Sequence, residues 1–139
     1  MMTTRIIFLA LICGVSTVAM SQAPGKAAAP SQPQSPVTEI SADLGPCSVE
    51  FHVTDLAGAP LYNAEIKTII RYGFLSKRKL ELQAGTNADG RARFVKLPAQ
   101  VKQPLTFEVR YKDQTAALSV DPGTECQARR DVPLDVKTK

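Results

Sequence analysis

Apolar and polar residues alternate along several short stretches of the chain from residue 47 onward. Val49, Phe51 and Val53 are separated by polar residues, and the apolar residues of the 105–111 stretch alternate with Thr, Glu and Arg. A period of two predicts strands with one buried face. No window of this region has the period of a helix. We therefore predict seven strands, at about residues 49–53, 64–71, 80–83, 92–97, 105–111, 115–120 and 126–134.

Turn-forming residues separate these strands. Gly58 lies within the 55–60 stretch, Gly90 follows Asp89, and a Pro-Gly pair occupies positions 122 and 123. Glycine adopts positive φ at little steric cost, and an Asp-Gly pair favours a tight connection. Short strands between such turns are typical of an antiparallel sandwich, with a barrel as the less favoured closure. The predicted fold class is all-β, a single seven-stranded antiparallel sandwich over residues 47–139.

Two motifs in this region are more specific than the alternation. Residues 55–64 have the spacing D-x-x-G-x-P-L-x-x-A, and residues 86–98 have the spacing T-x-x-D-G-x-x-x-F-x-x-L-P. Both resemble the signatures of the carboxypeptidase regulatory-like domain, over about residues 47–134. The resemblance implies a transthyretin-like or immunoglobulin-like sandwich, related to the B-type repeats of collagen-binding surface proteins. The motif residues make turns and fill the core, so the resemblance implies no active site. The long 69–79 stretch and the two cysteines of the domain depart from the family pattern.

The N-terminus has the layout of a secretory signal peptide. Arg5 supplies a positive charge, residues 6–15 form an uninterrupted apolar run, and small residues such as Ala19 and Ser21 follow. The run is too short for a transmembrane helix. We predict a signal peptide over residues 1–21, with an uncleaved N-terminal anchor as the alternative. The processed chain is then expected to lack a transmembrane span and to be secreted or periplasmic.

Composition changes after the signal. Residues 22–46 are rich in Pro, Ala, Ser and Gln, which predicts a flexible tether, either a spacer or only the slack left after cleavage. The chain has 17 Lys and Arg against 13 Asp and Glu, and loss of Arg5 with the signal leaves a net charge of +3. This mild excess permits weak attraction to anionic surfaces and does not indicate a nucleic-acid binder.

Cysteine usage fits an exported protein. Cys13 is removed with the signal, which leaves Cys47 and Cys126 at the two ends of the domain. In an oxidising compartment the simplest expectation is that these two form a disulfide. Two distant cysteines and one histidine are too few ligands for a metal site, so we predict neither a metal nor another cofactor.

The residues offer little for catalysis. Nucleophilic catalysis needs a nucleophile beside a base, and His52, the only histidine, lies on the polar side of its predicted strand. Transthyretin-like hydrolases use several histidines, so hydrolysis is only a minor alternative, resting on analogy of fold. Asn87 and Asp89 are oxygen ligands of the type that Ca²⁺ prefers, but a turn explains the pair better. We predict that the domain is not an enzyme.

One loop stands out as a candidate binding surface. It combines aromatic residues with positive charge, in Tyr72, Phe74, Lys77, Arg78 and Lys79. Such a loop suits an anionic sugar, a lipid headgroup or an acidic protein patch, although a hairpin with a solvated charge run is the simpler interpretation. The predicted function is an exported binding or scaffold module whose partner is an envelope protein or a glycan. The alternative is a carbohydrate-binding or envelope-binding accessory domain that uses Tyr72 and Phe74.

Overall fold

Strands make up nearly all the regular structure between residues 35 and 136, the part of the chain that the computed structural model describes. The predicted signal peptide and most of the predicted tether lie outside the described residues. A three-residue 3-10 helix, η1 (Phe74–Ser76), joins two of the strands. The eight strands are β1 (Thr38–Ser41), β2 (Cys47–Asp55), β3 (Glu65–Tyr72), β4 (Arg78–Gly85), β5 (Arg91–Leu97), β6 (Leu105–Tyr111), β7 (Gln114–Val120) and β8 (Gln127–Leu134). No helix in this part of the chain is long and apolar enough to cross a membrane.

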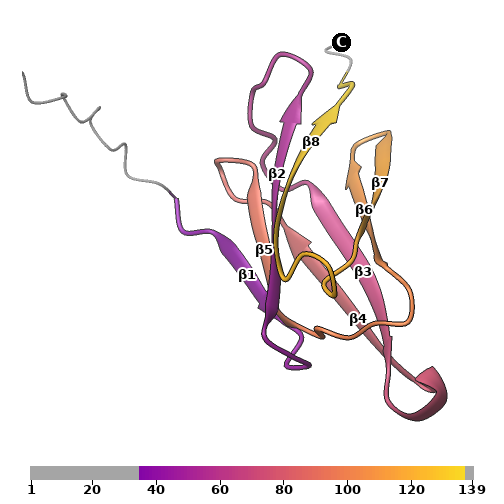
Figure 1. The fold of residues 1–139 in the computed structure, drawn as a ribbon. Coiled ribbons are helices and arrows are strands. Elements are labelled where there is room, and N and C mark those ends of the chain that lie inside the picture. Colours follow the sequence, from indigo (N-terminus) through magenta and orange to yellow (C-terminus); the bar gives the residue numbers. More distant parts are fainter. Residues whose placement is uncertain (1–34, 137–139) are drawn as a thin grey trace, which may run out of the picture. The chain divides into compact units, whose positions relative to one another are not determined.

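The strands form two four-stranded sheets, as in a β-sandwich (Figure 1). Sheet A has the order β1-β5-β2-β8, and sheet B has the order β4-β3-β6-β7. The prediction of an all-β fold is confirmed, but two of its details were wrong. The described residues form eight strands rather than seven, and the pairs β1–β5 and β2–β8 are parallel rather than antiparallel. Alternation reports which face of a strand is buried but not the direction of its neighbour, so it cannot reveal a parallel pair.

The additional strand, β1, comes from the stretch assigned to the tether. It pairs with β5 from Thr38 to Ser41. The chain just before it is held by the 86–90 turn, because the Asn87 side-chain amide donates to the carbonyls of Ser35 and Pro36, at 3.0 and 3.2 Å. The ordered domain therefore begins at least nine residues before β2.

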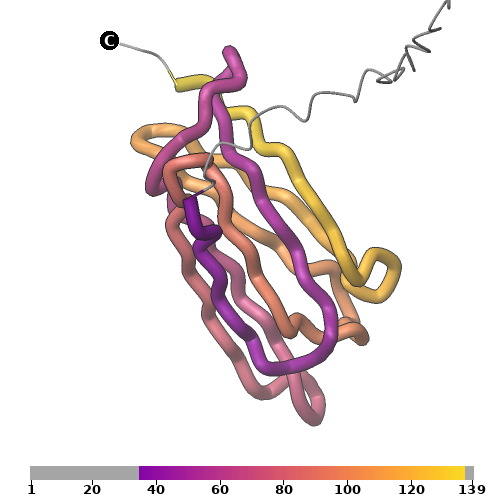
Figure 2. The backbone as a smooth tube through the Cα atoms, turned by 90° about the vertical axis from the view of Figure 1, so that its left-hand side faces the viewer, coloured from indigo at the N-terminus to yellow at the C-terminus, as the bar shows by residue number. Residues whose placement is uncertain are grey.

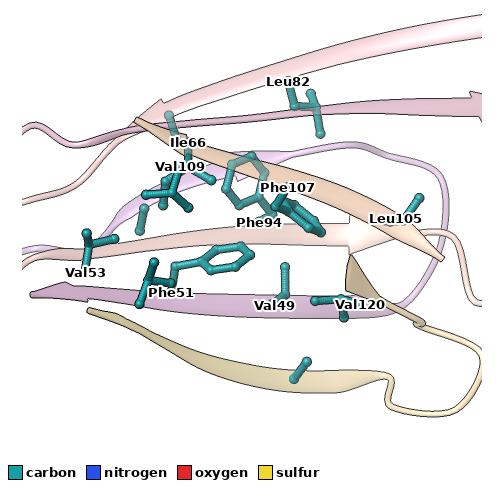
Figure 3. Packing of buried hydrophobic residues seen from close by; sticks show 14 of the residues in the cluster. Val49, Phe51, Val53, Ile66, Leu82, Phe94, Leu105, Phe107, Val109 and Val120 are labelled. Carbon is teal, nitrogen blue, oxygen red and sulfur yellow. The ribbon is translucent and has the colours of Figure 1, made fainter. Parts of the chain in front are cut away.

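The core lies between the two sheets and is built around three aromatic rings (Figure 3). Phe51, Phe94 and Phe107 are fully buried, and their ring centroids lie 4.8 to 5.9 Å apart. Aromatic pairs at such separations add to the free energy gained by burying their apolar area. The alternating residues of the predicted strands supply the surrounding aliphatic side chains. Figure 3 shows Val49, Val53, Ile66, Leu82, Leu105, Val109 and Val120 around the rings.

The second sequence motif serves the packing of the sandwich. Gly90 has φ +70°, and a Cβ atom there would lie 2.3 Å from the Val53 carbonyl oxygen, so only glycine fits. The buried Thr86 hydroxyl donates to the Leu61 carbonyl at 2.6 Å and accepts from the Ala64 amide at 2.8 Å. These contacts tie the turn before β5 to the segment that leads into β3.

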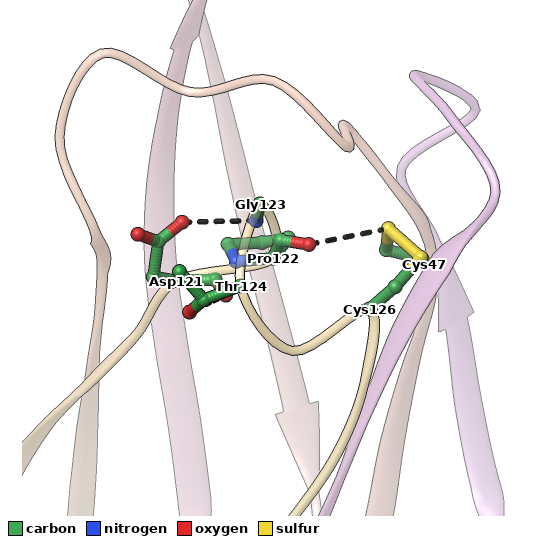
Figure 4. Close-up of a disulfide and its surroundings, with 6 residues drawn as sticks. All are labelled: Cys47, Asp121, Pro122, Gly123, Thr124 and Cys126. Atoms are coloured by element: carbon green, nitrogen blue, oxygen red, sulfur yellow. Dashed lines mark hydrogen bonds between the residues drawn. A yellow bond between two sulfur atoms is a disulfide. The ribbon is translucent and has the colours of Figure 1, made fainter.

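The predicted disulfide is present at the start of the parallel pair β2–β8 (Figure 4). Cys47 and Cys126 have Cα atoms 4.5 Å apart, and the Ser48 amide donates to the Cys126 carbonyl at 2.7 Å. Cys47 is buried, whereas Cys126 is exposed. The bond closes a separation of 79 residues and holds β8, the edge strand of sheet A, to the centre of that sheet.

Candidate functional site

The β3–β4 hairpin extends beyond the rest of sheet B. β3 pairs with β4 along its whole length, from Glu65 to Tyr72, but its pairing with β6 ends at Thr68. The last four residues of β3 therefore pair with β4 alone. Figures 1 and 2 place the connection between these strands at one end of the sandwich, opposite the C-terminal end of β8. We call residues 71–79 the tip.

The tip contains all five residues of the predicted binding surface. Phe74 is 84% exposed and Leu75 is 62% exposed, so two large apolar side chains face solvent side by side in the sequence. Tyr72 is half-buried, and Lys77, Arg78 and Lys79 are exposed. Single exposed apolar residues are ordinary on a protein surface, whereas an adjacent pair at a projecting end is a candidate contact site.

The backbone of the tip adopts an uncommon conformation. Gly73 has φ +76°, and both Leu75 and Ser76 have φ +55°. The left-handed region costs a non-glycine residue about 1 kcal/mol or more. The Ser76 amide donates to the Gly73 carbonyl at 3.1 Å, which closes the turn without burying Phe74 or Leu75. The turn is therefore locally strained, and it leaves both apolar side chains in solvent.

Four cations lie in the tip together with the apolar pair: Arg71, Lys77, Arg78 and Lys79. The hairpin register places Arg71 directly opposite Lys79. Like charges in directly opposite positions destabilise a strand pair. Within residues 35–136, none of the four lies within ion-pair distance of a carboxylate. The tip therefore carries an excess of positive charge, which the attraction between Lys79 and Glu81 on the same strand offsets in part.

The nearest acidic side chain on the hairpin already has a partner. Glu81 accepts from the Lys67 ammonium at 2.6 Å. This hydrogen bond, together with the attraction between the two charges, lowers the pKa of Glu81 and raises the pKa of Lys67. Glu81 therefore stays ionised and paired with Lys67. It lies two residues from Lys79 on β4, and the charge of Lys79 also lowers the pKa of Glu81, but the two side chains form no ion pair.

A groove of about 580 Å³ runs beside the hairpin, where β3 and β6 diverge. Its walls are the outer face of β3, residue 76 of the tip, and the loop that leads into β6. The lining residues are Lys67, Thr68, Ile69, Arg71, Ser76, Val101, Lys102, Gln103, Pro104, Leu105, Thr106 and Glu108. Arg71 belongs to both the groove and the tip, so the two surfaces are continuous.

The other candidate residues lie elsewhere. His52 lies on the outer face of sheet A, where its Nδ1 is 3.3 Å from a carboxylate oxygen of Asp131. Asn87 is buried in the turn, and its Oδ1 accepts from the amides of Asp89 and Arg91, at 3.1 and 2.8 Å. The side-chain oxygen of Asn87 thus has a structural role in the turn. No group of three or more potential metal ligands occurs in the described part of the chain.

Sequence reasoning named the aromatic and basic residues of the tip but missed three contributors. Leu75 is as much a part of the apolar pair as Phe74, and its position directly after Gly73 and Phe74 was an available signal. Arg71 was assigned only to a strand. Lys102 comes from a loop far away in sequence, and only the folded structure shows that it lines the same groove as Arg71.

Comparisons with known proteins add little. No family model matches the chain, and no match was found among curated proteins. Among solved structures, the chain is similar to a 3-chlorocatechol 1,2-dioxygenase from Rhodococcus opacus 1CP, with 17% identity and a TM-score of 0.39. The likeness covers 64% of this chain and 51% of the dioxygenase, so the chain spans about half the length of that enzyme. A likeness of this degree carries no argument about function, and the resemblance to the carboxypeptidase regulatory-like domain stays a prediction.

Proposed function

We propose that the chain is an exported, non-enzymatic binding module of the cell envelope that recognises an anionic partner through the tip. The observation that carries the proposal is the exposed pair Phe74 and Leu75 beside four cations that form no ion pair within residues 35–136. Exposed apolar area and excess positive charge both cost the free protein stability, and a partner that covers one and neutralises the other removes both costs.

Other features support export and binding. The disulfide and the signal-like N-terminus fit an oxidising compartment. The side chain of His52 forms a hydrogen bond with Asp131. Within residues 35–136, His52 forms no hydrogen bond with a hydroxyl or thiol group. A histidine oriented by a carboxylate but without a nucleophile lacks the arrangement that nucleophilic catalysis needs.

The test is co-sedimentation of the exported protein with envelope fragments of the organism that encodes it. The tip variant Lys77→Gln, Arg78→Gln, Lys79→Gln is compared with a matched variant, Arg91→Gln, Arg93→Gln, Arg129→Gln, on the outer face of sheet A. Both lose three positive charges. We expect the tip variant to bind at least about ten-fold more weakly, because each cation near an anionic surface contributes about 1 kcal/mol. We expect little change for the matched variant. Equal binding by the two variants would refute recognition through the tip.

The carbohydrate alternative rests on Tyr72 and Phe74, which lie on the same stretch of the tip. Aromatic rings stack on sugars, so this alternative predicts that a Tyr72→Ala, Phe74→Ala double variant loses retention on an envelope-glycan column. Unchanged retention would remove the alternative.

A further inference from the structure

The apolar residues of the tip lie where the hairpin projects beyond the rest of sheet B. Phe74 and Leu75 are both exposed in the hairpin turn, and the groove lies to the side of it. A projecting end whose apolar side chains are in solvent does not enclose a sugar ring or a peptide side chain. The partner that covers such an end must itself be deformable and apolar below its surface.

The cations and the tyrosine form a second layer behind the apolar pair. Arg71 and Lys79 lie on the outer face of the hairpin, and Tyr72 pairs with Arg78 one position nearer the turn. A strand rises about 3.3 Å per residue, so this layer lies within about 10 Å of the turn. An interfacial segment buries its apolar part about 5–10 Å into the boundary between headgroups and acyl chains. Cations and tyrosine are the residues that favour the headgroup level.

From this layering we propose that the tip is a membrane contact: Phe74 and Leu75 enter the interface of a bilayer with anionic lipids, and Arg71, Lys77, Arg78 and Lys79 bind the lipid phosphates. The inference rests on the proposed function, for which it names the partner. An aliphatic side chain next to the aromatic one adds apolar area for insertion but offers no stacking surface to a sugar. The charges are spread over both strands of the hairpin, which suits a planar array of phosphates better than a single anion.

The chain contains no tryptophan, so one introduced residue can report on the environment of the tip. Phe74→Trp is compared with Leu56→Trp, because Leu56 is 69% exposed in the turn after β2, at the opposite end of the sandwich. With vesicles of phosphatidylcholine and 30% phosphatidylglycerol, we expect the emission of the Phe74→Trp protein to shift to the blue. We expect no shift for Leu56→Trp, and none for either protein with pure phosphatidylcholine.

The affinity for vesicles then distinguishes the contribution of the apolar pair from that of the cations. We expect Phe74→Ser, Leu75→Ser to bind the anionic vesicles about thirty-fold more weakly, and Leu56→Ser to bind them as the unchanged protein does. We expect Lys77→Gln, Arg78→Gln, Lys79→Gln to lose about a hundred-fold in affinity, whereas the matched variant of sheet A keeps its affinity. The thermal unfolding midpoint of each variant is measured first, and affinities are compared only for variants whose midpoint is unchanged.

Three outcomes would overturn the inference. If the exported protein sediments with envelope fragments but Phe74→Trp does not shift with anionic vesicles, the lipid assignment fails and the proposed function stands. If polyglutamate, and not the vesicles, shifts the Phe74→Trp emission, the tip binds acidic polypeptides instead. If millimolar inorganic phosphate alone produces the shift, the tip is a site for soluble anions.

Discussion

The outer face of sheet A and the tip of the β3–β4 hairpin both carry many charges but arrange them in opposite ways. Across sheet A, the register sets Glu39, Arg93, Glu50 and Arg129 side by side on four neighbouring strands, so that the sign alternates. Arg129 lies 3.3 Å from Glu50 within this row. At the tip, Arg71 faces Lys79 with no acid between them.

This difference supports the proposal that the charges of sheet A serve solubility, whereas those of the tip bind a partner. The row on sheet A is balanced within the domain and gives the sheet a solvated face that resists pairing with other chains. The tip is unbalanced and adds strained backbone and exposed apolar side chains. Excess charge, strained backbone and exposed apolar side chains each lower the stability of the free protein. Their occurrence at one place supports the proposal of a binding site, because other sequences would form a more stable hairpin turn.

The largest expected effect concerns the stability of sheet A. We expect Cys47→Ala, Cys126→Ala to lower the free energy of unfolding by about 4.5 kcal/mol, because the bond closes a loop of 79 residues in the unfolded chain. Urea unfolding of the exported protein with and without reductant measures this loss. Reductant should reproduce it in the unchanged protein and have no effect on the double variant. A loss below about 1 kcal/mol would show that the hydrogen bonds of β2 with β8 hold the edge strand unaided.

A second comparison sets a core phenylalanine against the one at the tip. We expect Phe94→Ala to cost about 4 kcal/mol, since the ring is fully buried between Phe51 and Phe107 and its loss leaves a cavity. We expect Phe74→Ala to change stability by less than about 0.5 kcal/mol, because its side chain is in solvent. Urea unfolding of both variants gives the two values. A cost above about 1 kcal/mol for Phe74→Ala would mean that the tip supports the fold.

The core could be predicted from sequence because burial follows from local alternation. Phe51, Phe94 and Phe107 each lie in an alternating stretch, and all three are fully buried. The turns at Gly58 and Gly90 could also be predicted from sequence, and both glycines have positive φ. Alternation alone does not describe the 92–97 stretch. Lys96 has φ +54°, and this breaks the alternation between Phe94 and Leu97.

Features that depend on distant pairing could not be predicted. β1 is four residues long and has a single apolar side chain, Ile40, so that its strand character comes from pairing with β5 rather than from its own pattern. The parallel direction of β8 depends on which strand lies beside it. The tip was visible in sequence as an aromatic and basic loop. The groove was not, because it forms where β3 separates from β6 and a loop from residues 101–104 lines the gap.

The smallest expected effect tests most directly the difference in charge arrangement between sheet A and the tip. Lys79→Glu places an acid opposite Arg71, whereas Arg93→Glu places an acid between Glu39 and Glu50. Directly opposed charges change the stability of a strand pair by about 0.5 kcal/mol, with the sign set by whether they attract or repel. We therefore expect charge reversal to destabilise sheet A more than the hairpin, where the gain opposite Arg71 is offset by loss of the attraction between Lys79 and Glu81. Urea unfolding at low salt measures both effects, and 1 M NaCl should reduce both, because it screens exposed charges beyond about 3 Å. If both variants were destabilised equally, the cations of the tip would be balanced by groups that the pairing register does not bring together, and the argument for an anionic partner would lose its electrostatic basis.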